Sequence, residues 1–303
     1  GFVGHHLTRQ LVSGGHQVTG LVHPDEPAGK SLAVSVTPVD ILDDGALQKV
    51  IRDLAPEAIV HLAAFSNPEG SMTKATETLT TNIIGTQNLL AAALDSGGSP
   101  RVLLVGSSQQ YGRVDASEQP IREDRAQEPL TPYAVSKSSQ EMLGRLFFLS
   151  NKLSVYLARS FNHTGPGQAE GYVCSSFARQ VVEAEKKVRK PIIRVGNLEV
   201  RRDFTDVRDV ARAYQAILES GQPGRTYNVC SAKAVSIRGI LETLIELSGA
   251  QVEIQVDPDR YHAFDAPLLV GDHSRLREDT GWGPKMSLRE TLSDLLDDWR
   301  ERV

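Results

Sequence analysis

Tyr133 and Lys137 stand four residues apart in the stretch Thr-Pro-Tyr-Ala-Val-Ser-Lys at 131–137, and together they could carry acid/base chemistry. Thr131 suits a helix N-cap and Pro132 suits the first turn, so the pair is predicted to share one helical face. A phenol titrates at about 10, and a neighbouring ammonium group would lower its pKa. Such a tyrosine could exchange a proton with an alcohol oxygen. Surface helices also carry this spacing by chance, so the neighbouring elements must show whether the pair is catalytic or only part of a solvated helical face.

A buried parallel strand is predicted just upstream, over residues 101–105, because the run Arg-Val-Leu-Leu-Val is short, apolar and followed by Gly106. A hydroxyl at the carboxyl end of such a strand lies in the crevice where open α/β sheets bind ligands. Ser107 could therefore hydrogen-bond the same substrate oxygen as Tyr133. An ordinary strand-end turn is the alternative for Ser107, but the three residues in this order are more specific than any one of them.

The chain resembles the extended short-chain dehydrogenases/reductases that act on sugar nucleotides, essentially from end to end. Within that family, residues 161–168 and 191–209 look most like the branch of GDP-4-keto-6-deoxy-mannose reductases, which make GDP-rhamnose. The resemblance implies that Ser107, Tyr133 and Lys137 are catalytic. It rests on Gly-Phe-Val-Gly at 1–4, His-Leu-Ala-Ala at 61–64, Asn-x-x-Gly-Thr at 82–86, Ser-Ser at 107–108, Tyr-Gly at 111–112, Tyr133 with Lys137, Phe-Asn-His-Thr-Gly-Pro-Gly at 161–167 and Arg-Asp-Phe-Thr-Asp-Val-Arg-Asp-Val at 202–210.

The alternation of strand and helix signals predicts an α/β fold with a doubly wound parallel sheet of Rossmann type and a smaller C-terminal α/β substrate lobe. Residues 1–160 are expected to form the dinucleotide-binding domain, and residues from about 204 to 230 to return to it. Residues 161–303 are expected to form mainly the sugar-nucleotide lobe. The predicted strands are 17–22, 32–38, 58–62, 102–105, 153–158 and 225–229, and the predicted helices are 79–94, 133–148 and 173–187.

The chain begins inside the glycine motif of such a fold, where Gly1 matches the middle glycine and Gly4 the third. The first strand and the first glycine are therefore expected to be missing, which would leave a gap in the centre of the sheet. We interpret the sequence as a fragment of a natural chain, or as one whose first residues were not recorded. A protein that truly lacked this strand would put cofactor binding in doubt.

NADP or NAD is the cofactor that the resemblance implies. Amides near the start of the first helix can face a pyrophosphate, and Gly4 lets that helix approach a strand closely. His23 follows the second strand, where an acidic residue favours NAD and an arginine favours NADP, so a histidine selects neither. The full set of expected cofactor contacts is Gly1, Phe2, Val3, Gly4, His23, Asp40, Ile41, Leu62, Ala63, Ala64, Tyr133, Lys137, Phe161 and His163.

Dehydration, epimerisation and reduction can all share the Ser-Tyr-Lys set. The 4,6-dehydratases that resemble this chain need a carboxylate two positions after the catalytic hydroxyl, and Gln109 stands there instead. An amide cannot accept and return a proton near neutral pH. We therefore expect NAD(P)H-dependent reduction of the 4-keto group of a GDP-linked 4-keto-6-deoxy hexose, giving a GDP-6-deoxy sugar such as GDP-D-rhamnose. A nucleotide-sugar 4-epimerase and a catalytically silent nucleotide-binding protein remain as alternatives.

The resemblance also implies contacts to the substrate. Asn162 matches an asparagine that binds the diphosphate, and the guanidinium fork of Arg202 suits a nucleotide or diphosphate, although a surface salt bridge with the aspartates of its own motif is the alternative. Relatives carry a second diphosphate-binding arginine where this chain has His262, and Arg260 is the candidate substitute. The expected substrate contacts are Ser108, Gln109, Asn162, Arg202 and Arg260.

Bulk composition limits the possible partners. With 303 residues the chain can bury a large core, and its net charge of −5 gives no support for binding nucleic acid or an anionic membrane. No apolar run reaches membrane-spanning length and no signal peptide is visible, so we expect a cytoplasmic protein. Cys174 and Cys230 form neither a disulfide framework nor a zinc pattern, and no metal is expected. The resemblance implies a homodimer in which helices 79–94 and 133–148 form a four-helix bundle.

Overall fold

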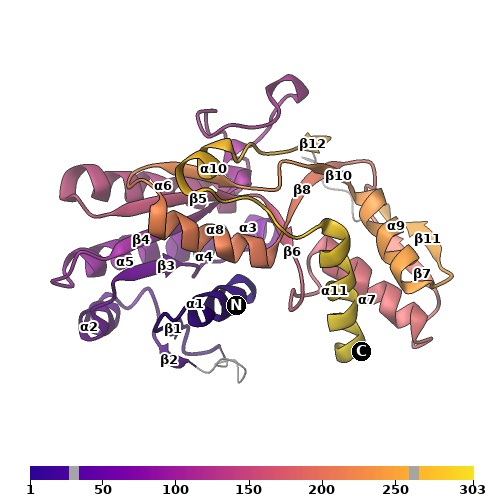
Figure 1. Ribbon diagram of the computed structural model, residues 1–303, viewed down its shortest axis with the longest axis horizontal. Coiled ribbons are helices and arrows are strands. Elements are labelled where there is room, and N and C mark those ends of the chain that lie inside the picture. Colours follow the sequence, from indigo (N-terminus) through magenta and orange to yellow (C-terminus); the bar gives the residue numbers. More distant parts are fainter. Residues whose placement is uncertain (27–33, 259–265) are drawn as a thin grey trace.

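A parallel sheet lies at the centre of the larger lobe of the computed structural model, which describes residues 1–26, 34–258 and 266–303 (Figure 1). Its strand order is β3-β4-β5-β9. The strands are rich in valine and leucine, and β5 is buried along its whole length, as expected of a parallel sheet covered on both faces. The bounds are Ala58–His61 for β3, Arg101–Ser107 for β4, Val155–Ser160 for β5 and Thr226–Val229 for β9.

A second parallel pair, β1 (Thr19–Val22) and β2 (Ser35–Pro38), belongs to the same lobe but forms a separate sheet. Within the described residues no strand joins this pair to the four-stranded sheet, which is the gap predicted from the glycine motif. The predicted α/β class with parallel sheets is therefore confirmed.

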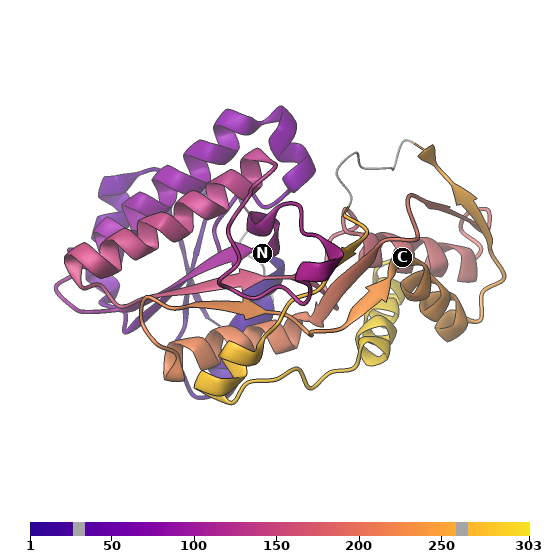
Figure 2. The same ribbon diagram turned by 90° about the horizontal axis from the view of Figure 1, so that it is seen from above.

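Helices cover both faces of the sheet. Figure 2 shows α5 (Gly85–Leu94) and α6 (Pro132–Asn151) on one side, and α8 (Val207–Ser220) with α10 (Ser274–Thr280) on the other. α1 (Phe2–Ser13) packs against α8, and α2 (Asp44–Leu54) packs against α5. The helix that carries the Tyr-x-x-x-Lys pair begins as predicted, because the Thr131 hydroxyl accepts a hydrogen bond from the Ala134 amide at 3.1 Å.

The helix predicted at 79–94 is interrupted. It consists of α4 (Ala75–Leu79), a π-helical turn at Thr80–Ile84 and α5, with a short α3 (Pro68–Thr73) before it. The turn places Asn82 so that its amide donates to the Phe65 carbonyl at 3.1 Å and to the Ser136 hydroxyl at 2.8 Å. This asparagine therefore joins the loop after β3 to α6, the helix of Tyr133 and Lys137.

The smaller lobe holds two further sheets. β8 lies between β10 and β12 and also pairs with β6, while β7 pairs with β11. Helices α7, α9 and α11 enclose its apolar core, in which Phe177, Leu241 and Leu295 are buried. Among the described helices, none is both long enough and apolar enough to span a bilayer. The bounds are Asn162–Thr164 for β6, Val173–Glu185 for α7, Ile192–Val195 for β7, Arg201–Asp206 for β8, Ala234–Ser236 for β10, Ile237–Ser248 for α9, Glu253–Val256 for β11, Leu268–Leu269 for β12 and Leu288–Arg302 for α11.

The chain returns to the larger lobe after β8. α8 packs against α1, and β9 joins the main sheet beside β5, as the sequence predicts. α10 also packs against α8 and β9, so part of the segment after 230 accompanies the larger lobe. The domain limits 1–160 and 161–303 remain a prediction.

Candidate active site

Ser107, Tyr133 and Lys137 meet where β4 ends and α6 begins. Ser107 is the last residue of β4, and the other two residues lie on the first turns of α6. All three side chains are buried, and the hydroxyl of Ser107 lies near enough to the phenol of Tyr133 to lower its pKa against the effect of burial. The structure thus brings together the three residues predicted to be catalytic.

Ser107 is held from both sides by the short 3₁₀ helix Ser108–Tyr111. Its amide donates to Gln110 Oε1 at 2.7 Å, and its hydroxyl oxygen accepts from the Gln109 amide at 3.2 Å. The side chain of Gln110 is buried and that of Gln109 is exposed. Gln110 therefore orients the end of β4, a role that sequence reasoning missed.

The pKa of Tyr133 does not follow the sequence-based expectation. Burial raises it to about 12, and the hydrogen bond with Ser107 opposes that shift. Lys137 was expected to lower it, but the Lys137 ammonium donates instead to the Val105 carbonyl at 2.8 Å and to Gln140 Oε1 at 3.0 Å. The phenol of Tyr133, like an unperturbed phenol, is protonated at neutral pH, which suits a proton donor.

Lys137 itself has an unusual pKa, which burial lowers to about 8. The imidazole of His61 lies nearby at the end of β3, and its pKa is lowered to about 3 by burial and, to a smaller degree, by the charge of Lys137. His61 is therefore neutral, and its Nε2 is hydrogen-bonded to the Thr86 hydroxyl at 3.0 Å. Lys137 is the group beside Tyr133 that changes charge near physiological pH.

The start of α1 fits the phosphate end of a dinucleotide. Gly1 is the N-cap of α1 and makes no side-chain cap hydrogen bond, so the first amides of α1 lie at the positive end of the helix, where anions bind. A Cβ at Gly4 would make ordinary van der Waals contact with Leu62 at 3.7 Å, so α1 packs beside the residue that follows β3. The ring of Phe2 stacks on that of His163 with 6.2 Å between centroids. Near them, Val3 packs on the core beneath α1, Ala63 is exposed and Ala64 is half-buried.

His23 and Asp40 lie together at the carboxyl ends of β1 and β2. His23 Nε2 is 3.8 Å from Asp40 Oδ2, and both side chains are exposed. Asp40 Oδ1 also accepts from the Leu42 amide at 2.9 Å, which fixes the turn that follows β2. Ile41 packs against α5, because a Cβ at Gly85 would overlap its side chain. These residues form one surface that suits the adenosine half of a dinucleotide.

Two of the predicted contact residues also make contacts within the protein. The ring of Phe161 is buried against that of Tyr111, 6.3 Å away between centroids, in an apolar cluster that also contains Ile121 and Cys230. Its carbonyl is hydrogen-bonded to His163 Nδ1 at 3.0 Å. Arg202 donates to the Ala266 carbonyl at 2.6 Å and so holds the chain that leads into β12. Ser108 is buried, Asn162 is half-buried on β6, and Arg260 and His262 lie outside the described residues.

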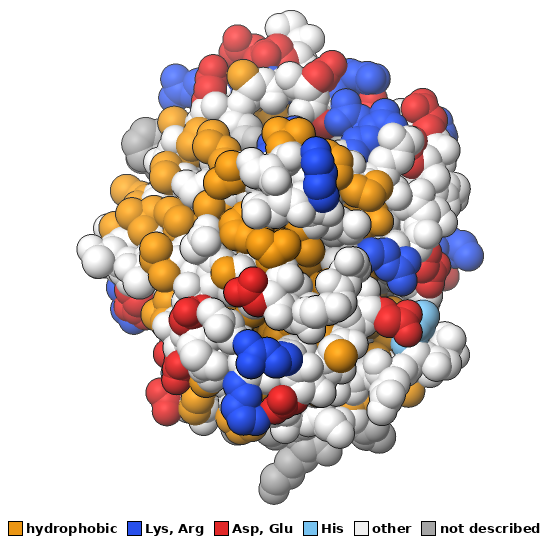
Figure 3. Space-filling view, turned by 90° about the vertical axis from the view of Figure 1, so that its left-hand side faces the viewer, with side chains coloured by type: hydrophobic (Ala, Val, Ile, Leu, Met, Phe, Trp, Pro, Cys, Tyr) orange, Lys and Arg blue, Asp and Glu red, His pale blue; other side chains and the backbone are white. Residues whose placement is uncertain are grey.

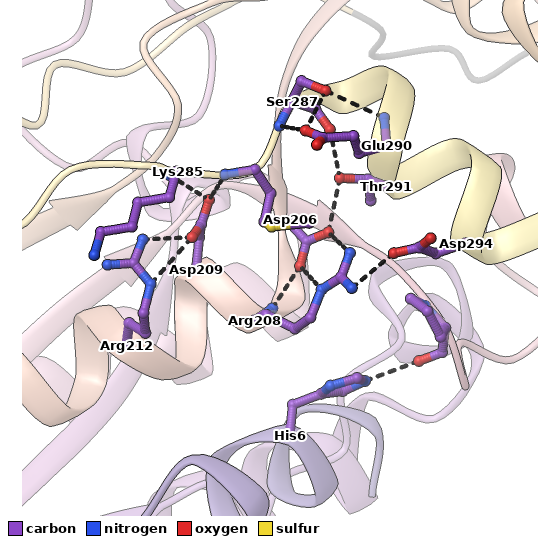
Figure 4. Close-up of polar contacts among 12 residues, drawn as sticks. His6, Asp206, Arg208, Asp209, Arg212, Lys285, Ser287, Glu290, Thr291 and Asp294 are labelled. Carbon is purple, nitrogen blue, oxygen red and sulfur yellow. Dashed lines mark hydrogen bonds and ion pairs between the residues drawn. The ribbon is translucent and has the colours of Figure 1, made fainter. Parts of the chain in front are cut away.

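The carboxylates that follow Arg202 in its motif hold the C-terminal part of the chain (Figure 4). Asp206 accepts two hydrogen bonds from the Arg208 side chain and one from the Thr291 hydroxyl at 2.7 Å. Arg208 also pairs with Asp294 of α11. Nearby, His6 Nε2 is hydrogen-bonded to the Pro166 carbonyl at 2.8 Å, which joins α1 to the loop after β6. Neither Asp206 nor Asp203 forms the salt bridge considered for Arg202, because backbone groups and Arg208 or Ser231 occupy them.

Among the residues that the structure describes, no group of three or more His, Cys, Asp or Glu side chains is placed to hold a metal ion. Both cysteines are buried and reduced. Burial raises the pKa of Cys174 to about 12, so its thiolate is not available near neutral pH.

Comparison with known proteins agrees with this geometry. Residues 1–295 match the family described as GDP-mannose 4,6 dehydratase. A GDP-6-deoxy-D-mannose reductase from Pseudomonas aeruginosa is 36% identical over 87% of this chain and 86% of its own length. The structure of RMD from Pseudomonas aeruginosa complexed with NADPH has a TM-score of 0.87 at 34% identity, covering 100% of this chain and 97% of that one.

A UDP-glucose 4-epimerase from Thermus thermophilus in complex with NAD has a similar fold, with a TM-score of 0.89 at 26% identity over 100% of this chain and 97% of that chain. Relatives with reductase, dehydratase and epimerase names thus share the architecture. The family match over nearly the whole sequence agrees with the motifs and the assembled Ser-Tyr-Lys set. The chain therefore belongs to the GDP-mannose 4,6-dehydratase family of short-chain dehydrogenases/reductases.

Proposed function

We propose that the chain reduces the 4-keto group of a GDP-linked 4-keto-6-deoxy hexose, giving a GDP-6-deoxy sugar such as GDP-D-rhamnose. Family membership makes it an NAD(P)-dependent enzyme of sugar-nucleotide metabolism. The relative named GDP-6-deoxy-D-mannose reductase, and the NADPH complex with a similar fold, support the choice of reaction. A bound reduced nicotinamide would supply the hydride to carbon 4.

The buried set of Ser107, Tyr133 and Lys137, assembled where β4 ends and α6 begins, is the observation that carries this proposal. Reduction of a ketone adds a hydride to carbon and a proton to oxygen, so the enzyme must begin each turnover with a proton on its acid. A buried phenol with a pKa of about 12 holds that proton at neutral pH. Transfer to the substrate oxygen leaves a phenolate, which solvent must reprotonate before the next turnover.

The neighbours of Tyr133 have complementary roles. The Ser107 hydroxyl, which lies beside the phenol, can donate to the same carbonyl oxygen and stabilise the charge that develops there. The ammonium of Lys137 can bind the nicotinamide ribose and stabilise the Tyr133 phenolate after proton transfer. A lysine with a pKa of about 8 has this charge at neutral pH and loses it in mild alkali.

Gln109 supports reduction rather than dehydration. Its side chain is exposed beside Ser107, whereas the side chain of Gln110 points into a buried network with Glu141. The group that emerges beside the catalytic hydroxyl is therefore an amide. An amide cannot shuttle the protons that elimination of water between carbons 5 and 6 requires.

A homodimer is the assembly that fits the surface of α6. Val135, Met142, Leu146 and Leu149 are spaced at intervals of seven, four and three residues and are 40%, 63%, 52% and 65% exposed. Such a stripe on one helical face is long enough to pack against a helix. Figure 3 shows apolar side chains gathered along the left edge of the face it views. A second copy would cover the stripe and form a four-helix bundle from two α5–α6 pairs.

Incubation with GDP-4-keto-6-deoxy-mannose and NAD(P)H tests the reaction. We expect one nicotinamide oxidised for each sugar reduced, deuteride from labelled cofactor at carbon 4, and no dehydration of GDP-mannose. Interconversion of two 4-hydroxy sugars without net oxidation would identify an epimerase instead. No turnover by a chain that includes the first strand would favour the silent nucleotide-binding protein.

A further inference from the structure

Gln140 contacts Lys137 inside the protein. It lies three residues after Lys137 on α6 and is 1% exposed. Its Oε1 accepts from the Lys137 ammonium at 3.0 Å, and its Nε2 donates to the Val105 carbonyl at 3.2 Å. The same carbonyl accepts from Lys137 at 2.8 Å. The three groups form a closed hydrogen-bonded triangle at the end of β4, one residue before Gly106 and two before Ser107.

The triangle supplies hydrogen-bond acceptors to a buried ammonium group. A buried ammonium group is costly unless acceptors surround it, and Lys137 has three N–H donors on a flexible stem. In the described part of the chain, Val105 and Gln140 accept from this ammonium. One donor remains for a ligand, and the other two contacts restrict where the nitrogen can lie.

We propose that Gln140 is a positioning residue, which keeps the Lys137 ammonium charged and aimed so that its remaining N–H group binds the nicotinamide ribose. This proposal rests on the proposed function only for the identity of the ligand, the nicotinamide ribose. It does not require Gln140 to touch substrate or cofactor. The carboxamide acts through Lys137, since its oxygen stabilises the charged form and its nitrogen anchors the oxygen to β4.

Other ionisable groups around Lys137 do not replace this contact. His61 is neutral, Tyr133 is protonated, and Glu141 is already paired with Arg159 at 2.8 Å. The elements packed against α6 also carry Glu69, Glu77, Arg101, Tyr111, Tyr156 and Arg159. Among all these groups, none is hydrogen-bonded to the ammonium in the described structure, so Gln140 is the side chain that stabilises its charge.

Two substitutions move the Lys137 pKa in opposite directions. Gln140→Met keeps the length of the side chain but removes the acceptor, so the ammonium should lose its proton at lower pH. Gln140→Glu places a carboxylate against the ammonium and should hold the proton to higher pH, with each shift about one pH unit. Gln48→Met serves as the matched control, because Gln48 lies on α2 and, within the described residues, its amide is hydrogen-bonded to exposed Asp44.

The readout is NADPH affinity, measured by fluorescence titration without sugar between pH 6 and 10. Affinity of the unsubstituted protein should fall above about pH 8, as the ammonium is lost. The fall should begin at lower pH in Gln140→Met and at higher pH in Gln140→Glu, with about a tenfold difference between each variant and the parent in the steep region. Gln48→Met should follow the parent.

Superimposable pH profiles for the parent and both Gln140 variants would overturn the proposal, as would shifts in the same direction. If Gln140→Met does not fold, judged by urea unfolding, the proposal is tested by Gln140→Glu alone, whose loss of NADPH affinity should begin at higher pH than in the parent. Opposite shifts in a protein that reduces no keto sugar would preserve the role of Gln140 and refute the proposed reaction, so the two failures are distinguishable.

Discussion

Replacing Glu141 by glutamine should destabilise the protein strongly, because this carboxylate is the centre of a buried polar network behind the active site. Its Oε1 accepts from Arg159 at 2.8 Å and from Arg145 at 3.1 Å, and its Oε2 accepts from Arg159 at 2.8 Å and from Gln110 at 3.0 Å. The side chains of Glu141 and Arg159 are 5% and 3% exposed. The change would leave a buried guanidinium without its counter-charge.

Removing one partner of a buried ion pair costs about 3–5 kcal/mol, against about 0–1 kcal/mol for an exposed pair. Hydrogen bonds and charge from Arg159 hold the pKa of Glu141 below its ordinary value, although burial acts to raise it. A carboxylate with a depressed pKa contributes stability above its unfolded-state pKa, ordinarily 4.5, and the contribution is lost as pH falls through the folded-state value. The difference between parent and variant should therefore be constant above about pH 5 and shrink below it.

Urea unfolding at pH 7 and at several lower pH values measures this difference. Asp53→Asn is the matched control, since it makes the same change of charge on an exposed helix where Asp53 pairs with Lys49. We expect the control to lie within 1 kcal/mol of the parent protein by the same rule. A Glu141→Gln variant as stable as the control at pH 7, or a difference that grows as pH falls, would refute the network argument.

Two further results are expected. Tyr133→Phe removes the proton donor and should lower turnover by about 10²–10⁴-fold while NADPH affinity is retained, measured by cofactor oxidation and fluorescence titration; turnover close to that of the parent would remove Tyr133 from the mechanism. Met142→Asp places a charge in the exposed stripe of α6, so light scattering should show a monomer in place of the parent dimer. Met72→Asp, a control at an exposed methionine on α3, should leave the dimer intact. A parent protein that is itself monomeric at micromolar concentration would exclude the dimer.

Local patterns in the sequence were sufficient to predict the strand and the helix that carry the candidate catalytic residues. The apolar run 101–105 and the Thr-Pro cap before Tyr133 determine β4 and the start of α6 through short-range rules, so both lie where predicted. The glycine motif likewise predicted the gap between the two parallel sheets. Because these two elements carry Ser107, Tyr133 and Lys137, local prediction placed each residue on its element, and the family resemblance supplied the expectation that the three side chains meet.

Contacts between distant residues could not be read in the same way. Gln110 and Glu141 are 31 positions apart, and Glu141 reaches Arg159 on a different strand. The pKa of Tyr133 moved opposite to the expected direction, because burial outweighed any effect of Lys137. Burial depends on the packing of the whole lobe, which helical spacing does not encode.

The aspartates at 203, 206 and 209 show why a family motif does not by itself identify catalytic groups. Each side chain is buried, so each carboxylate must be satisfied by protein donors. Asp203 accepts from the amides of residues 231, 232 and 271, Asp206 from Thr291 and Arg208, and Asp209 from the amides of residues 285 and 286. The three therefore hold segments from β9 to α11 in place around β8. Any variant of these residues that lowers activity should also lower stability, whereas loss of Tyr133 should lower activity alone.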